Sequence, residues 1–305
     1  MSRVAVLKGG WSAERDVSLV SGRECAAALE KLGHIVKQID VTRDLGKLVT
    51  DLTPKPDVVF NALHGRGGED GTIQGVLEML RVPYTHSGVL ASAVAMDKPI
   101  AKQVFAAAGL PLAEGKVVTR AALLAGDVMA RPFVVKPINE GSSVSVFIVR
   151  PQDNSWPQAA SGWPFEEALV ESYIPGREIT VAVMGDRALG VCEIQSKAGA
   201  FYDYESKYAS GGSDHLVPAP IHPDAYRAAL DIGLHAHQAL GCRGVSRADL
   251  RYDDTAGEPG RMVLLEINTQ PGMTPTSLVP DIARYVGIDF IELVRWIVEH
   301  AACDS

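Results

Sequence analysis

The first third of the chain alternates short apolar runs with longer amphipathic segments, a pattern that predicts strands separated by helices. The predicted elements are, in order, a strand at 4–7, a helix at 13–32, a strand at 35–41, a connecting helix, a strand at 57–63, a helix at 73–80 and a strand-like segment at 82–84. This βαβαβα order predicts a parallel sheet with helices on both faces. Ligands bind such sheets at the carboxyl ends of the strands, where the glycine-rich loops 8–12 and 64–71 lie.

The pattern changes after about residue 95, where short strands recur between glycines and prolines. A helix at 98–108, stopped by Gly109 and Pro111, leads into this region. The stretch 196–214 has little periodicity and is predicted to be a long loop, of the kind that often forms a functional lid. Strands are predicted at 133–136, 144–149, 169–173, 179–184, 188–194, 245–252 and 262–268, with helices at 223–240 and from about residue 289.

Two late strands carry polar side chains at alternate positions. Arg247, Asp249 and Arg251 are two residues apart and share one face of their strand, as Glu266 and Asn268 do on the next. If the strands are neighbours, Asp249, Glu266 and Asn268 converge as three oxygen donors, a set that suits Mg²⁺ held partly by substrate phosphates. The alternative is a solvated strand face with cross-strand charge pairs. The Pro-Gly turn that follows favours the metal site, because its backbone N–H groups can face an anion.

Three lysines, Lys98, Lys136 and Lys207, lie at structural transitions rather than on a helix face. Lys136 ends an apolar strand, so its amino group must either reach the surface or meet an anion. The loop at 140–144 that follows is rich in small residues, as loops that cover phosphates tend to be. A solvated surface position explains each lysine alone, but together with a magnesium site the three favour nucleotide phosphates.

The amino-terminal loop gives a weaker signal. Gly9 and Gly10 follow a strand, but the GxGxxG pattern of dinucleotide-binding sites is absent, so a nicotinamide-dependent oxidoreductase has little support. Glu14 is explained equally well by a favourable interaction with the positive end of the following helix. His64 has the position of an ordinary loop histidine.

Composition and charge narrow the range of functions. The 305 residues suffice for two or three domains, and 47% hydrophobic and 22% charged residues are ordinary for a globular protein. A net charge of −8 argues against nucleic acid as a partner, although a local basic cluster can still bind an anionic small molecule. The sequence contains no apolar run that predicts a membrane span and no signal peptide. With four scattered cysteines, these features predict a cytoplasmic protein with free thiols.

Four motifs, in order along the chain, resemble those of the D-alanine–D-alanine ligases, members of the ATP-grasp superfamily. They are GGWSAERDVS at 9–18, LHGRGGEDG at 63–71, EGSSV at 140–144 and NTQPGMT at 268–274. The likeness extends from about residue 4 to the last helix. It implies an amino-terminal Rossmann-like parallel-sheet domain at 1–95 and then two α+β domains, at 96–178 and 179–305, that clasp ATP and carry a lid at 196–214.

The resemblance also implies how ATP is held. Lys98 and Lys136 would bind its phosphates, and Lys207 would reach the transferred group from the lid. Glu171 and Glu178 would lie at the adenine and the ribose. Two Mg²⁺ ions, with Mn²⁺ as a substitute, would be bound by Asp249, Glu266 and Asn268.

For the amino acid substrates, the resemblance implies a second group of residues. Glu14 would pair with the ammonium group of the first D-alanine, with His64 nearby. Glu14, Ser142 and Tyr208 would form a hydrogen-bonded trio that ties the lid to the first domain. The remaining implied contacts are Ser277 and the backbone of Leu278 to the carboxylate of the second D-alanine, and Arg247 and the N–H of Gly272 to the oxyanion.

The activity implied is ATP-dependent formation of D-alanyl-D-alanine through an acyl phosphate, for peptidoglycan synthesis, by an enzyme that is a homodimer. The alternatives are a related ligase that makes D-alanyl-D-lactate or D-alanyl-D-serine, and a nucleotide-binding regulatory protein without catalysis. Tyr208 favours the dipeptide, since depsipeptide-forming relatives commonly have His there. The chain departs from the family pattern at Ser145, where Gly is usual, and at Gln270 and Pro275.

Overall fold

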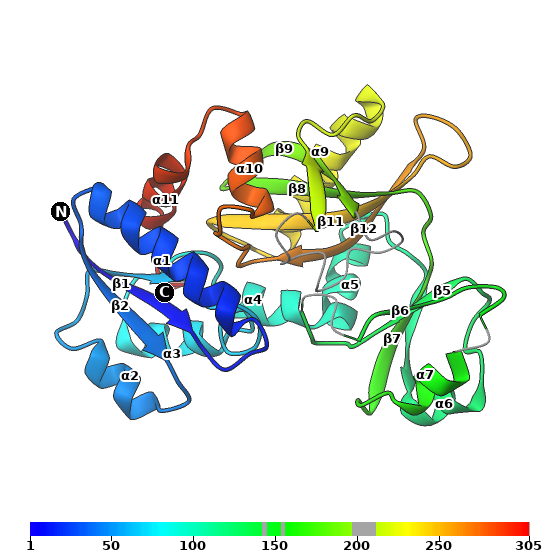
Figure 1. Cartoon of the computed structure of the whole chain (residues 1–305), viewed down its shortest axis with the longest axis horizontal. Coiled ribbons are helices and arrows are strands. Elements are labelled where there is room, and N and C mark those ends of the chain that lie inside the picture. Colours follow the sequence, from blue (N-terminus) through cyan, green and yellow to red (C-terminus); the bar gives the residue numbers. More distant parts are fainter. Residues whose placement is uncertain (142–144, 154–155, 197–211, 305) are drawn as a thin grey trace.

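The computed structural model describes residues 1–141, 145–153, 156–196 and 212–304, which form three sheets flanked by helices. Figure 1 shows a small sheet with its helices at the amino-terminal end of the molecule and a second sheet at the opposite end. The third and largest sheet lies between them. Within the described parts of the chain, the helices lack the length and the apolar content that crossing a bilayer requires.

The amino-terminal sheet is parallel, with strand order β2-β1-β3, as the alternating pattern predicts. Val4 and Val6 of β1 pack with α1 on one face, while Ala5 and Leu7 pack with α2 and α3 on the other, because successive side chains of a strand point to opposite faces. The elements are β1 (Arg3–Gly9), α1 (Arg15–Lys31), β2 (Ile35–Val41), α2 (Leu45–Asp51), β3 (Val58–Asn61) and α3 (Thr72–Leu80).

Two details of this region differ from the prediction. The strand predicted at 57–63 ends at Asn61, whose side-chain Oδ1 accepts a hydrogen bond from the N–H of Leu63 and so turns the chain out of the sheet. The segment at 82–84 contributes one parallel bridge, from Tyr84 to Val59, rather than a full strand. The helix α4 (Val89–Met96), absent from the prediction, follows it.

The second sheet is antiparallel, with strand order β4-β7-β5-β6. Its core is aromatic: Phe133 meets Trp156 edge to face, and the fully buried Trp163 lies beside them. The elements are α5 (Lys98–Ala107), β4 (Gly115–Thr119), α6 (Arg120–Ala125), β5 (Phe133–Lys136), β6 (Phe147–Val149), α7 (Trp156–Ser161) and β7 (Glu167–Ser172). Of the strand predicted at 144–149, residue 144 lies outside the described residues, and the strand is confirmed from Phe147 to Val149.

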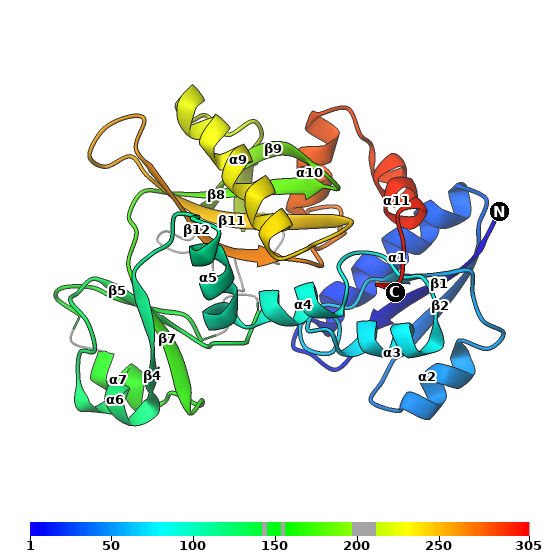
Figure 2. The same ribbon diagram turned by 180° about the vertical axis from the view of Figure 1, so that it is seen from behind.

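The largest sheet is also antiparallel, with strand order β10-β9-β8-β11-β12. Helices α9 and α5 cover one of its faces (Figure 2), and α10 covers the other. The elements are β8 (Arg177–Met184), β9 (Arg187–Ser196), β10 (Ser213–Leu216), α9 (Pro223–Ala239), β11 (Val245–Asp253), β12 (Arg261–Asn268), α10 (Leu278–Tyr285) and α11 (Phe290–Glu299).

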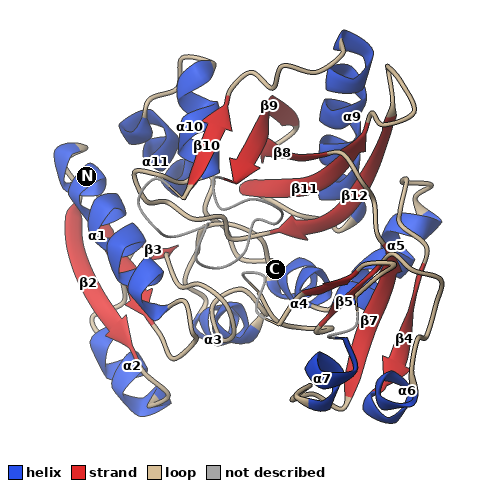
Figure 3. Cartoon of the chain, turned by 45° about the vertical axis from the view of Figure 1, so that its right-hand side comes forward, coloured by secondary structure: helices blue, strands red, loops and turns tan. Residues whose placement is uncertain are grey.

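One apolar core joins the two ends of the chain. Leu29 of α1 and Val6 of β1 belong to the same buried cluster as Ile282 of α10 and Ile297 of α11. Figure 3 shows α11 beside α1, with α10 next to α11. Arg243 strengthens this junction, because its guanidinium donates hydrogen bonds to the carbonyl oxygens of Tyr84 and Ala302. The carboxyl-terminal helices therefore complete the core of the amino-terminal sheet.

Candidate active site

A cleft lies where the loops after β1 and β3 meet the ends of β11 and β12 and the start of α10. Four singled-out residues lie outside its described lining: Asp249 on β11, Lys136 on β5, Glu171 on β7 and Glu178 on β8. Ser142, Lys207 and Tyr208 fall outside the residues that the structure describes. The cleft brings together nine of the residues singled out in the sequence: Glu14, His64, Lys98, Arg247, Glu266, Asn268, Gly272, Ser277 and Leu278.

The strands β11 and β12 are neighbours, as the metal hypothesis requires. Asp249 stands opposite Glu266 and Arg247 opposite Asn268 in the antiparallel register. Among the described residues, no three His, Cys, Asp or Glu side chains are grouped to hold a metal. Two carboxylates and one amide oxygen nevertheless fit Mg²⁺, which uses few protein ligands where phosphates supply the rest.

Arg247 and Asp249 bind each other along the same strand. Arg247 donates from Nε and Nη2 to the two carboxylate oxygens of Asp249, at 2.8 and 2.6 Å. Thr180 of β8 donates a further hydrogen bond of 2.7 Å to Asp249 Oδ1. The paired bonds of a guanidinium to a carboxylate fix both side chains in orientation. Contacts from two strands, β11 and β8, therefore hold the carboxylate of Asp249.

Lys98 lies at the start of α5, beside the carboxylate pair. Its Nζ donates a hydrogen bond of 2.6 Å to the carbonyl oxygen of Glu140 and lies 3.7 Å from Glu266 Oε2. The side chain of Asp97 caps the helix by accepting from the N–H of Ile100. The sequence thus fixes the helix start, and with it the position of the lysine between the loop at 140 and β12.

Lys136, Glu171 and Lys102 form a buried group of three charges. Lys136 Nζ lies 2.5 Å from Glu171 Oε2, and Lys102 binds the other carboxylate oxygen. Burial opposes the charge of Glu171, but the two lysines outweigh it and hold its pKa below the ordinary value. Burial likewise opposes the charge of Lys136, yet Glu171 and Glu266 raise its pKa. Lys102 was not singled out in the sequence, because it has the spacing of an ordinary helix lysine.

Glu178 lies on β8, away from these charges. It stands opposite Arg251 in the sheet, and the two side chains approach to 3.9 Å. Arg251 also donates hydrogen bonds to the carbonyl oxygens of Ile174 and Gly176, at 3.1 and 2.7 Å. The loop between β7 and β8 is thereby held against β11, so that Glu171 and Glu178 flank one loop.

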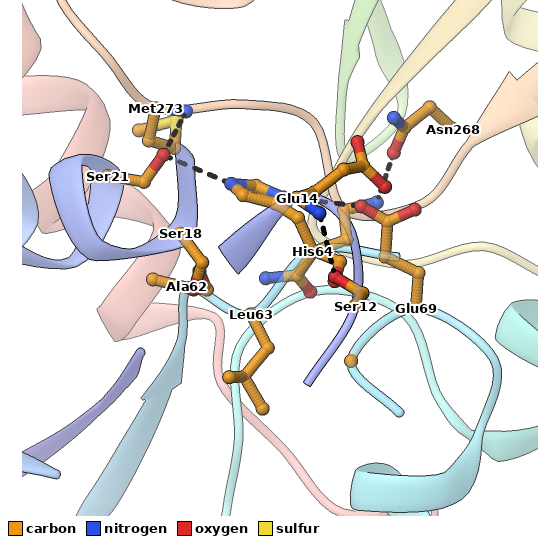
Figure 4. Close-up of polar contacts among 12 residues, drawn as sticks. Ser12, Glu14, Ser18, Ser21, Ala62, Leu63, His64, Glu69, Asn268 and Met273 are labelled. Carbon is orange, nitrogen blue, oxygen red and sulfur yellow. Dashed lines mark hydrogen bonds and ion pairs between the residues drawn. The ribbon is translucent and has the colours of Figure 1, made fainter. Parts of the chain in front are cut away.

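Glu14 is buried where the first glycine-rich loop meets the second (Figure 4). The hydroxyl of Ser12 accepts a hydrogen bond from the N–H of Glu14 and donates one to the carbonyl of His64. A side chain at Gly65 would place its Cβ 2.7 Å from Glu14 Oε2. Gly65 also has a φ of +67°, a conformation that glycine adopts at little cost. Glycine is therefore required here for Glu14 to occupy its position.

His64 belongs to a buried polar network that its sequence position did not reveal. Its Nδ1 lies 3.2 Å from Glu69 Oε1, and its Nε2 lies 3.0 Å from the hydroxyl of Ser21. Burial alone lowers the pKa of His64, but Glu69 and Glu14 outweigh it and raise the pKa. Burial and the charge of Glu14 raise the pKa of Glu69. Ser21 was missed because a serine on a helix has many ordinary explanations.

The loop between β12 and α10 is held by its own hydroxyl groups. Ser277 Oγ accepts from the N–H of Thr274 at 2.9 Å, and a Cβ at Gly272 would lie 2.8 Å from the same oxygen. Ser277 precedes α10, whose first N–H groups have no partner within the helix. Leu278, at the first helical position, lines the cleft. A helix start of this kind favours an anionic group.

Ser145 directly follows the segment at 140–144 that is rich in small residues. Its φ is +55°, in the left-handed region that most side chains avoid. The backbone here thus keeps the conformation that glycine favours, although the chain carries serine.

Comparison with known proteins matches both parts of the chain. A family model described as the D-ala D-ala ligase N-terminus matches residues 44–87, and one described as the C-terminus matches residues 104–299. A D-alanine–D-alanine ligase of Paramagnetospirillum magneticum is 64% identical over 306 residues, covering 99% of each chain. Another, from Granulibacter bethesdensis, is 60% identical over 302 residues, covering 99% of this chain and 98% of the relative.

Solved structures agree with this match. A D-alanine–D-alanine ligase from Bacillus anthracis, 31% identical, superposes with a TM-score of 0.83 over 98% of this chain and 97% of its own. The same enzyme complexed with ATP, 28% identical in the alignment, gives a TM-score of 0.80 over the same shares. The expected ATP-grasp fold, with an amino-terminal parallel sheet followed by α+β parts, is confirmed. The chain belongs to the family of D-alanine–D-alanine ligases.

Proposed function

We propose that this chain joins two D-alanines into D-alanyl-D-alanine with conversion of ATP to ADP and phosphate, and so supplies peptidoglycan synthesis. The observation that carries the proposal is the pairing of Asp249 with Glu266 on neighbouring strands, beside Arg247 and Asn268 and next to Lys98. This is the oxygen-donor and cation set that phosphoryl transfer needs. The relatives named above, 60 and 64% identical over nearly the whole chain, share that activity by name.

ATP binds in this proposal between the two antiparallel sheets. Lys98 and Lys136 bind its phosphates, exchanging carboxylate partners for phosphate oxygens. Glu171 lies at the adenine and Glu178 at the ribose, on either side of one loop. The solved relative that holds ATP, with a TM-score of 0.80, supports this use of the fold.

We propose that Asp249, Glu266 and Asn268 hold two Mg²⁺ ions, with Mn²⁺ as a substitute. The chemistry that such ions supply is neutralisation of charge on the β- and γ-phosphates. The protein's part is to fix the ligands, and Thr180 and Arg247 do so by holding the carboxylate of Asp249. Arg247 then exchanges part of this contact for the substrate.

In this proposal the two amino acids bind on the side of the phosphates that faces away from the adenine and the ribose. Glu14 accepts the ammonium group of the first D-alanine, with His64 and Glu69 behind it. The carboxylate of the second D-alanine binds Ser277 and the N–H of Leu278 at the start of α10. Burial of these groups makes each charge-assisted contact stronger than it would be in water.

Two steps follow from this placement. A carboxylate oxygen of the first D-alanine attacks the γ-phosphorus, the bond to the β-phosphate oxygen breaks, and ADP leaves. The neutral amine of the second D-alanine then attacks the acyl carbon, and the carbonyl electrons move onto the oxygen. Arg247 and the N–H of Gly272 stabilise this oxyanion. Collapse expels phosphate, and the amine loses its proton to give the amide.

The roles of Ser142, Lys207 and Tyr208, and the lid at 196–214, stay predictions from the sequence. The same holds for the division into domains at 1–95, 96–178 and 179–305.

We further propose that the enzyme works in the cytoplasm as a homodimer. Sedimentation equilibrium of the full chain measures the mass directly, and a monomer at micromolar concentration would contradict the dimer.

The proposed reaction is tested by phosphate release with ATP and Mg²⁺ in the presence of D-alanine or L-alanine, with the products resolved by mass. We expect phosphate release with D-alanine but not with L-alanine, and a yield of dipeptide equal to that of phosphate. Adding D-lactate or D-serine beside D-alanine tests the alternative ligases, since a mixed product would identify one of them. Folded protein that binds ATP but releases no phosphate with either alanine contradicts the proposal.

A further inference from the structure

Ser21 is a fully buried residue of α1 whose hydroxyl contacts two distant parts of the cleft. It lies 3.0 Å from His64 Nε2, in the loop after β3, and it accepts a hydrogen bond of 3.3 Å from the N–H of Met273, in the loop before α10 (Figure 4). A serine hydroxyl has one proton and two lone pairs. It can therefore serve His64 as donor or acceptor and still accept from Met273.

The contact with Met273 fixes the backbone beside Gly272. The N–H of Met273 and the carbonyl of Gly272 belong to one planar peptide unit, so holding one end sets the orientation of the whole unit. Gly272 itself has no side chain to restrain it, and a Cβ there would lie 2.8 Å from Ser277 Oγ. The N–H of Gly272 belongs to the preceding Pro271–Gly272 unit, which joins the held unit at the Cα of Gly272, so the contact with Met273 limits its direction through that shared atom.

The other contact leads to the binding site for the first amino acid. His64 is held between Ser21 and Glu69, and the charge of Glu14 acts on both His64 and Glu69. Glu14 and His64 line the cleft together with Gly272. One hydroxyl therefore connects the side of the cleft that carries Glu14 to the loop that carries the Gly272 amide.

We propose that Ser21 is a positioning residue for the second step of the reaction, holding the Gly272 N–H against the site where the acyl carbonyl lies. The inference rests on the proposed function, in which that N–H stabilises the oxyanion. Ser21 touches neither substrate. Its effect passes through the Gly272–Met273 peptide unit and through His64.

This role predicts that loss of the Ser21 hydroxyl slows the second step of the reaction and leaves the first step active. Without the hydroxyl, the Gly272 N–H shifts and amine attack slows, while Lys98 and Glu266 still support phosphoryl transfer. The acyl phosphate then persists, and water cleaves it to D-alanine and phosphate. ADP is formed without a matching amount of dipeptide. A displacement of about 1 Å in such a group lowers the rate up to about 100-fold.

The test compares Ser21→Ala and Ser21→Cys with Ser18→Ala as the matched control. Ser18 lies one turn earlier on α1 and is also fully buried, but its hydroxyl binds the N–H of Gly9 and the carbonyl of Ala62. Cysteine fills the space of serine and hydrogen-bonds weakly. ADP and D-alanyl-D-alanine are measured in the same reaction, so that their ratio is independent of the fraction of folded enzyme.

We expect both Ser21 variants to lower the kcat for dipeptide formation about 10- to 100-fold and to release ADP in excess of dipeptide, with an unchanged KM for ATP. Ser18→Ala should keep the wild-type ratio, whatever its stability. Wild-type coupling in Ser21→Cys would show that packing rather than the hydroxyl matters, and would overturn the inference. A wild-type enzyme that forms no dipeptide would instead refute the proposed function.

Discussion

The lysines that we propose as phosphate ligands each lie beside a carboxylate. Lys136 pairs with Glu171, and Lys98 lies 3.7 Å from Glu266. A buried charge without a partner is costly, so these pairs keep the lysines charged and ordered in a partly closed cleft. In the proposed function, binding of phosphate would exchange one anionic partner for another and leave the carboxylate of Glu266 to hold Mg²⁺.

Replacing Glu266 with Gln tests that assignment at a single residue. The amide keeps the shape of the side chain but carries no charge to hold a cation, so we expect phosphate release to fall below detection while the fold is kept. Phosphate release and thermal unfolding measure the two effects. Glu292→Gln, at an exposed ion pair with Arg295, is the control and should leave both unchanged. Wild-type turnover by Glu266→Gln would refute the metal site.

Lys102→Met leaves Glu171 with one of its two buried cationic partners. We expect the free energy of unfolding at pH 7 to fall by about 1 to 3 kcal/mol, since a charged hydrogen bond in the interior is lost. The pKa of Glu171 is lowered in the folded protein, so this contribution exists above the unfolded value of 4.5 and is lost as the pH falls below it.

Denaturant unfolding at pH 7 and near pH 4 measures this loss as a difference from the wild type. The exposed pair of Lys47 with Asp51 provides the control, and Lys47→Met should leave the free energy of unfolding nearly unchanged. An equal cost for Lys102→Met at both pH values would contradict the role of the ionised Glu171.

At the scale of elements, the loops between strands and helices set the shape of the cleft. The loop after β3 turns sharply at Gly65, and its close approach to Glu14 leaves no room for a side chain. The loop before α10 is held by Ser277 and Thr274. Both loops lie at the ends of strands, where a rigid sheet fixes their origins.

Gly65→Ala tests the first loop. The added Cβ would lie 2.7 Å from Glu14 Oε2 and must displace it, so we expect the KM for D-alanine to rise about tenfold or more, and that for ATP to change less. Gly33→Ala is the control, because Gly33 has a φ of +83° but no atom within 4 Å of the added Cβ. It should lower stability by about 1 kcal/mol and leave the kinetics unchanged. Equal effects of both variants on KM would exclude the contact.

Local patterns predicted the elements that alternate or repeat clearly. The alternation from Arg247 to Arg251 predicted β11 and its polar face, and nine of the residues singled out in the sequence line the cleft. The strand β4 (Gly115–Thr119) was missed because it is largely exposed and lacks an apolar face. The helix α10 was missed because Pro280 lies in its first turn, and a proline in the sequence is usually a signal against a helix.

Contacts between distant segments could not be predicted in this way. Ser21 and Met273 are 252 residues apart, and nothing in either local pattern indicates the other. Lys102 has the spacing of a surface lysine, and only the packing of α5 against the two sheets buries it beside Glu171. Side-chain networks of this kind depend on the tertiary fold, so they become visible only in three dimensions.

At the scale of the whole molecule, two buried histidines make stability depend on pH. His86 packs edge to face on Phe60, and burial, helped by His64 and Arg243, lowers its pKa to about 4. Burial also lowers the pKa of His237 to about 4. As the pH falls, both histidines become protonated near their ordinary pKa of 6.5 in the unfolded chain, but only near pH 4 in the folded protein. The stability that these two histidines contribute is therefore fully present above pH 6.5 and is lost as the pH decreases toward 4.

His86→Asn removes one of these two proton-linked contributions. Asn tolerates the φ of +67° at this position. We expect the free energy of unfolding of the wild type to fall by up to about 3 kcal/mol per histidine between pH 6.5 and pH 4, and the variant to show a shallower dependence over that range. Denaturant unfolding across the range measures both slopes. Identical slopes would exclude His86 as a source of acid sensitivity.

The core shared by α1 and α11 also restricts how such a chain can be recombined with its relatives. In a hybrid that takes the segment up to α4 from one enzyme and the remainder from another, Leu29 of the first enzyme would have to pack with Ile297 of the second. A crossover in a surface loop is then tolerated only if two helices at opposite ends of the sequence have kept complementary volumes. For this chain, exchange of the first sheet should succeed more often when α10 and α11 are transferred with it.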